Sequence, residues 1–126
     1  MKYLPFIESA CVGVGVWVGI GAWGGAREPW DGPLYWTVGF PVMASCAFLI
    51  ALFAPQKPWR WGGMMMLAQA ICGFAQAFPD INLWPLSLVM HFFLSLPLVA
   101  AAYFGSLVNR MLRLSAAEPS DAAASR

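Results

Sequence analysis

The stretch Val12–Gly25 reads VGVGVWVGIGAWGG, in which glycine alternates with branched or aromatic residues at almost every second position. Such alternation is found in a β-strand, in a glycine-rich phosphate loop, or in a helix with few side chains on one face. A phosphate loop needs the spacing G-x-G-x-x-G at the start of a helix, or a Walker lysine, and these glycines provide neither. A membrane β-barrel would alternate throughout, but ALFAP (51–55) and MMMLAQAICGFAQAF (64–78) do not. The stretch therefore predicts a membrane helix, whose backbone is fully hydrogen-bonded within lipid.

The composition of the whole chain agrees with this interpretation. Of the 126 residues, 60% are hydrophobic and 10% are charged, whereas about a quarter of a soluble domain is charged. Four intervals of 18, 25, 19 and 29 residues contain no charge: 9–26, 32–56, 61–79 and 81–109. About 20 apolar residues suffice for a helix to cross the hydrocarbon layer. We therefore predict an all-α integral membrane protein with four transmembrane helices, approximately 5–25, 33–54, 59–78 and 83–109.

We expect these spans to form a four-helix bundle of two antiparallel hairpins within one transmembrane domain, residues 1–114. The small and polar residues of 115–126 predict a flexible cytoplasmic tail. Pro41 and Pro97 lie inside spans, and each is expected to kink its helix because proline removes one backbone donor.

The basic residues predict the orientation, since lysine and arginine accumulate on the cytoplasmic side of a membrane. In a four-span threading only Arg27 falls on the outer side, and the other six fall together on the opposite side: Lys2, Lys57, Arg60, Arg110, Arg113 and Arg126. Both termini are therefore predicted to be cytoplasmic, in the inner membrane of a bacterium.

Glycine spacing in the first span predicts a surface for helix contact. Gly15 and Gly19 lie four residues apart, as do Gly21 and Gly25, and such small-xxx-small pairs allow two helix backbones to approach closely. We expect these glycines to pack inside the bundle, and the alternative is association with a second protein.

Polar residues inside the spans are candidates for a functional site, because they are costly in lipid. His91 is the clearest, and it either relays protons or binds a ligand, or donates one structural hydrogen bond across the bundle to Gln69. Gln76 lies two turns after Gln69 and offers a further hydrogen-bonding group. Glu8 lies in the first turn after Pro5, where a carboxylate favourably complements the helix dipole.

No catalytic constellation is visible in the sequence. The three cysteines lie on three different spans, which argues against a thiol–disulfide enzyme, and a single histidine cannot ligate a typical membrane haem on both sides. We expect no enzyme activity, no metal, no cofactor and no nucleic acid partner. The sequence favours a non-catalytic accessory, assembly or regulatory subunit that acts by helix–helix association in the lipid bilayer, as a homo-oligomer or within a larger membrane complex. The alternative is a small oligomeric transporter or proton-linked permease that uses His91 and Gln69.

Overall fold

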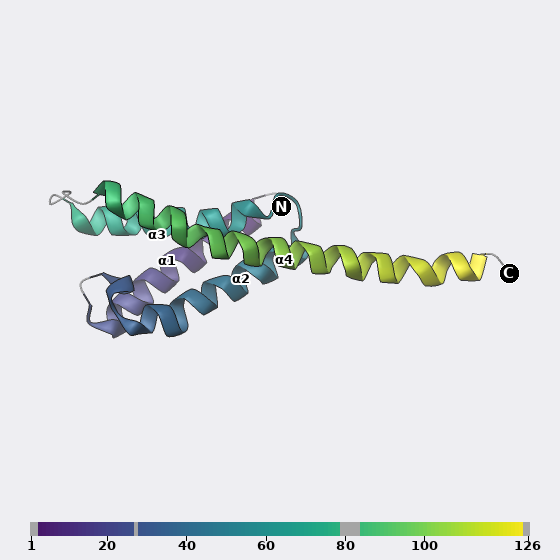
Figure 1. The fold of residues 1–126 in the computed structure, drawn as a ribbon, viewed down its shortest axis with the longest axis horizontal. Helices are drawn as coiled ribbons and strands as arrows, with labels where there is room; N and C mark the ends of the chain where they lie inside the picture. The colour runs from purple at the N-terminus through teal and green to yellow at the C-terminus, as the bar shows by residue number, and fades with distance from the viewer. Residues whose placement is uncertain (1–2, 27, 79–83, 125–126) are drawn as a thin grey trace.

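The computed structural model describes residues 3–26, 28–78 and 84–124, and within these ranges it is helical and contains no strand. Four α-helices follow one another along the chain: α1 (Leu4–Gly24), α2 (Phe40–Phe53), α3 (Trp59–Ala77) and α4 (Trp84–Ala124) (Figure 1). Two short elements lie between α1 and α2, the 3₁₀-helix η1 (Pro29–Asp31) and the π-helical turn η2 (Tyr35–Gly39). The predicted all-α class is confirmed.

Three helical segments are long and apolar enough to cross a membrane: Leu4–Gly24, Tyr35–Phe53 and Trp84–Ala116. These segments identify the chain as a membrane protein. The 19-residue helix α3 is not among them, because Arg60, Gln69 and Gln76 reduce its apolar character.

When η2 is counted with α2, this helical segment runs from Pro33 to Phe53, and the helices begin and end within one residue of the predicted spans with one exception. Gly25 follows α1 in the left-handed conformation, at a φ of 63°, which is a common helix C-cap. The exception is α4, which continues beyond the predicted end at residue 109 to Ala124 and extends well past the other helices (Figure 1). The alanine-rich stretch 115–126, which we expected to be a flexible tail, is therefore helical as far as Ala124.

Pro41 distorts its helix as expected. The backbone N–H of Phe40 bonds to the carbonyl of Tyr35, five residues earlier, so the turn before the proline is wider than an α-helical turn. A proline ring clashes with the carbonyl four residues before it, and a single π-turn relieves that clash. Helix α4, in contrast, continues through Pro97.

The most extensive contacts join α1 to α3, α3 to α4 and α2 to α4, whereas α1 and α2 touch far less. Helices α1 and α3 run in parallel, as shown by their paired residues Phe6 with Trp61 and Trp17 with Gln76. Helices α2 and α4 are also parallel. Helices α1 and α2 are thus held together mainly through their contacts with α3 and α4.

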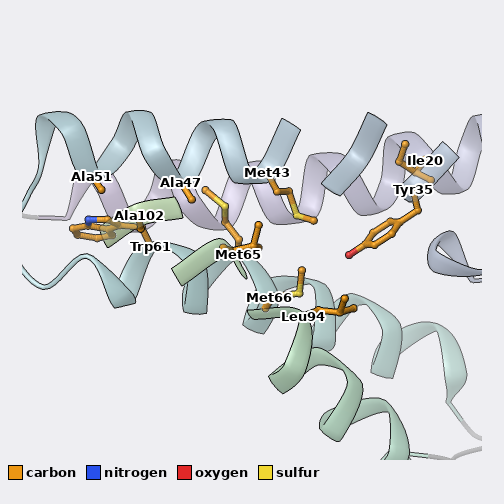
Figure 2. Close-up of a cluster of buried hydrophobic side chains, with 11 residues drawn as sticks. Ile20, Tyr35, Met43, Ala47, Ala51, Trp61, Met65, Met66, Leu94 and Ala102 are labelled. Atoms are coloured by element: carbon orange, nitrogen blue, oxygen red, sulfur yellow. The ribbon is translucent and has the colours of Figure 1, made fainter. Parts of the chain in front are cut away.

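The apolar core lies where α2, α3 and α4 meet (Figure 2). Its members are mostly alanine and methionine, and the side chain of Tyr35 reaches the same cluster from η2 (Figure 2). Alanine allows the helices to approach closely, and methionine fills the irregular space that remains. The fully buried side chains of this cluster are Tyr35, Met43, Ala47, Ala51, Met65, Leu98 and Ala102.

Candidate functional site

Each of the three main helix interfaces contains one glycine that has no room for a side chain. On α1, a Cβ atom at Gly13 would overlap the carbonyl of Met65 on α3. On α3, a Cβ atom at Gly62 would lie 2.7 Å from the carbonyl carbon of Leu98 on α4. On α4, a Cβ atom at Gly105 would overlap the carbonyl of Phe48 on α2. These three positions set how closely the helices approach.

The glycines that we expected to pack inside the bundle do not do so. A Cβ atom at Gly15, Gly19 or Gly25 would meet nothing within 4 Å, and one at Gly21 would only reach ordinary contact with Pro29. The buried face of α1 instead carries Ser9, Gly13, Trp17 and Ile20. Gly15 is two residues from Gly13 and therefore lies about 200° away around the helix. Gly25 lies beyond the helix and serves as its C-cap.

Gln69 joins α1, η2 and α2 to α3. Its Oε1 accepts a 2.7 Å hydrogen bond from the hydroxyl of Tyr35, and its Nε2 donates to the carbonyl of Gly13 at 3.2 Å. The same Nε2 lies 3.2 Å from the sulfur of Met43. Tyr35, Met43 and Gln69 are all fully buried. A buried amide whose oxygen and nitrogen both have partners stabilises one arrangement of the helices.

His91 lies on α4, and its hydrogen-bond partner is not Gln69, the partner that one of our two alternatives gave it. Its Nδ1 is 2.8 Å from the carbonyl of Ser87, one turn earlier on the same helix. Its ring packs against the indoles of Trp30 and Trp17, at centroid distances of 4.6 and 6.2 Å. The other nitrogen, Nε2, is buried and has no hydrogen-bond partner among the described residues. The polar atoms of Gln69 are bonded instead to Tyr35 and Gly13.

The remaining candidate residues lie apart. Gln76 is exposed at the end of α3, where its Oε1 accepts a 3.0 Å hydrogen bond from Nε1 of Trp17. Glu8 is exposed on α1 and faces away from the core. Cys11, Cys46 and Cys72 are free thiols on three helices, and Cys11 is exposed on the same face of α1 as Gly15. Among the described residues, no group of three histidine, cysteine or acidic side chains could hold a metal ion.

Two residues that position the helices were not recognised from the sequence. Tyr35 bonds Gln69, and a tyrosine inside an apolar span was a signal that its hydroxyl needs a partner. Asn109 donates a 2.7 Å hydrogen bond from Nδ2 to the carbonyl of Leu52, near the end of α2. Ser9-x-x-x-Gly13 is also a small-xxx-small pair, but nothing in the sequence ranks it above the pairs Gly15/Gly19 and Gly21/Gly25.

Comparison of the chain with protein-family models, with curated proteins and with solved structures finds no match. The site must therefore be interpreted from its own geometry. That geometry consists of a satisfied buried amide, a histidine enclosed by indoles, and a glycine face of α1 that no other described helix covers.

Proposed function

We propose that this chain is a small multi-pass protein of a bacterial inner membrane, acting as a non-catalytic accessory, assembly or regulatory subunit through helix–helix association. We further propose that α3 is a fourth span, that the four helices form one bundle of two hairpins, and that both termini are cytoplasmic. The apolar surroundings of α3 support its place in the membrane, since it packs between α1 and α4. The distribution of lysine and arginine supports the orientation.

The single observation that carries the association proposal is the uncovered face of Gly15 and Gly19. Both have open space where a Cβ atom would lie, and Cys11 continues the same row one turn earlier. Glycine inside a helix costs about 1 kcal/mol relative to alanine. The close contacts within the chain are made by other glycines, so this face is free for a helix of another protein or of a second copy.

The test is purification of the full-length tagged chain from membranes in mild detergent. Gly15→Leu and Gly19→Leu fill the row with side chains, and we expect each to remove the partner while the chain itself remains folded. Gly63→Leu is the matched control, because Gly63 on α3 also has open space around a Cβ atom. If all three variants retain the same partner and complex size, the association proposal is wrong.

A second candidate is a small oligomeric transporter or proton-linked permease. It is favoured by Nε2 of His91, which is buried and has no hydrogen-bond partner in the part of the chain that the structure describes. Gln69 contributes less to this candidate than expected, since its polar atoms are occupied by Tyr35 and Gly13. The test is reconstitution into liposomes that contain a pH-sensitive dye. Proton flux that is abolished in His91→Ala would support transport, and its absence from the parent protein would exclude it.

A further inference from the structure

A groove of about 1410 Å³ opens where the start of α1, the α2–α3 connection and the middle of α4 meet. Four of the residues that line it are cationic, and none of the described lining residues carries a carboxylate. The cations come from two separate parts of the chain: Lys57 and Arg60 from the connection and the start of α3, and Arg110 and Arg113 from α4. Residues 53 apart in the sequence thus contribute charge of one sign to one groove.

Two of the three guanidinium groups, those of Arg60 and Arg113, are held in place by neighbouring side chains. The guanidinium carbon of Arg60 lies 5.8 Å from the ring centroid of Phe6 and 5.6 Å from that of Trp59. Nε of Arg113 donates a 2.9 Å hydrogen bond to Oδ1 of Asn109, and Asn109 is itself fixed to the carbonyl of Leu52. Positioned guanidinium groups are well suited to a phosphate, whose oxygens accept paired hydrogen bonds.

Hydrogen bonds from α3 and α4 hold the start of the α2–α3 connection at the groove. Nε1 of Trp61 donates to the carbonyl of Ala54 at 2.9 Å, and the hydroxyl of Ser106 donates to the carbonyl of Pro55 at 3.2 Å. Helix α3 starts beside these residues, and its first turn contains no acidic side chain. The positive end of its dipole therefore adds to the field of the four cations.

The wall of the groove continues onto an apolar surface of the helices. Phe53, Phe104 and Leu107 line the groove and are also exposed. The segments Tyr35–Phe53 and Trp84–Ala116 are apolar enough to cross a membrane, so we expect these exposed side chains to face acyl chains. A free phosphate ion would use the cations only, whereas a phospholipid would use both the cations and the apolar wall.

We propose that this groove binds one anionic phospholipid, with its headgroup phosphate among Arg60, Arg110 and Arg113 and its acyl chains against Phe104 and Leu107. Basic pockets between transmembrane helices are a recurring form of anionic lipid site. The proposal is independent of the association face on α1, which lies on another part of the molecule.

The test is native mass spectrometry of the full chain in mild non-ionic detergent, titrated with phosphatidylglycerol, with phosphatidylcholine of the same acyl chains, or with inorganic phosphate. We expect one phosphatidylglycerol per chain and much weaker binding of phosphatidylcholine. Arg60→Gln and Arg113→Gln should each weaken phosphatidylglycerol binding about fivefold, and the double variant about 25-fold. Arg27→Gln is the matched control. It also removes one positive charge, but Arg27 follows the C-terminal end of α1, whereas the groove is at the start of α1. It should leave the affinity for phosphatidylglycerol unchanged.

Any one of the following three outcomes would contradict the proposal. Equal binding of the two lipids would show that the cations do not select the headgroup. If Arg27→Gln weakened phosphatidylglycerol binding as much as the groove variants do, the loss of affinity would reflect only the net charge of the chain. Displacement of the lipid by millimolar inorganic phosphate would identify the ligand as a free anion. Circular dichroism of each variant verifies that the helices are retained, so that a loss of binding is a property of the groove.

Discussion

The hydroxyl of Tyr35 donates a 2.7 Å hydrogen bond to Oε1 of Gln69, and both side chains are fully buried. The two residues are 34 positions apart, so the bond links η2 to the middle of α3. Gln69 also reaches the carbonyl of Gly13, which is accessible because the absence of a side chain at Gly13 brings α1 against α3. One amide thus joins three segments at the point where a glycine permits close approach.

Tyr35→Phe removes the hydroxyl and leaves Oε1 of Gln69 without its donor. An unsatisfied buried acceptor costs roughly 1–3 kcal/mol, and we expect the free energy of unfolding in detergent to fall by that amount. Tyr103→Phe is the control, since the Tyr103 side chain is half exposed. In the Gln69→Leu background the effect of Tyr35→Phe should be much smaller. Equal effects in both backgrounds would show that the bond contributes no stability.

Gly13→Ala and Gly15→Ala test which glycines hold the helices together. At Gly13 the added methyl overlaps the backbone of Met65, and overpacking of this kind lowers the free energy of unfolding by roughly 1–3 kcal/mol. At Gly15 the methyl meets open space, so the better helix propensity of alanine should stabilise the chain by up to about 1 kcal/mol. Gly105→Ala should behave like Gly13→Ala. The reverse order at positions 13 and 15 would mean that α1 presents its other face to α3.

Asn109→Ala leaves the carbonyl of Leu52 without its side-chain donor. We expect the free energy of unfolding to fall by about 1 kcal/mol, the usual net value of one hydrogen bond. Arg110→Ala is the neighbouring control, since the Arg110 side chain is exposed. A similar small effect of both variants would show that Asn109 does not cap α2.

Gly73 and Trp17 should be energetically coupled. A Cβ atom at Gly73 would lie 3.1 Å from Cη2 of the Trp17 indole, which is tighter than an ordinary contact. Gly73→Ala should therefore destabilise the parent chain more than it destabilises Trp17→Phe, where the smaller ring leaves room. Residues in contact couple by about 0.5–3 kcal/mol in a double-mutant cycle. Strict additivity of the two substitutions would contradict the contact.

Cysteine labelling tests the orientation of the helices. In a background that lacks the three native cysteines, Ser115→Cys should react with a membrane-impermeant maleimide only after the cytoplasmic face is opened. Ala26→Cys, just after the C-terminal end of α1, should react in intact cells because we expect that end to face outward. Reaction of Ser115→Cys in intact cells would place the C-terminal part of α4 outside.

The limits of the helices were predictable, because charge-free intervals and prolines mark them in the sequence. Pro33 begins a helix and Trp59 begins α3, as expected. The rotation of α1 was not predictable, since glycine and apolar residues occur on both of its faces. The choice between Gly13 and Gly15 depends on the fit of Gly13 against Met65 and of Trp17 against Gly73, which no single sequence reveals.

The partners of the polar candidate residues were likewise only partly predictable from the sequence. Gln69 was recognisable as a residue that needs a partner, but the partner follows from the packing of η2 and not from depth along the span. One alternative paired His91 with Gln69, whereas its ring packs against Trp30, which η1 brings to α4. Arg110 marks the limit of the charge-free interval from which the fourth span was predicted, and the helical backbone of α4 continues beyond it.

Site-directed cross-linking from Cys11 in intact membranes tests most directly whether the Gly15–Gly19 face of α1 associates with another helix. Cys11 is exposed on that face, and Cys46→Ser with Cys72→Ser leaves it as the single thiol. A short thiol-reactive cross-linker should join Cys11 to a second membrane chain, and Gly15→Leu should abolish the product whereas Gly63→Leu preserves it. A Cys11 thiol that reacts with lipid-soluble maleimide but yields no cross-linked product, or a product that Gly15→Leu leaves unchanged, would contradict association through this face.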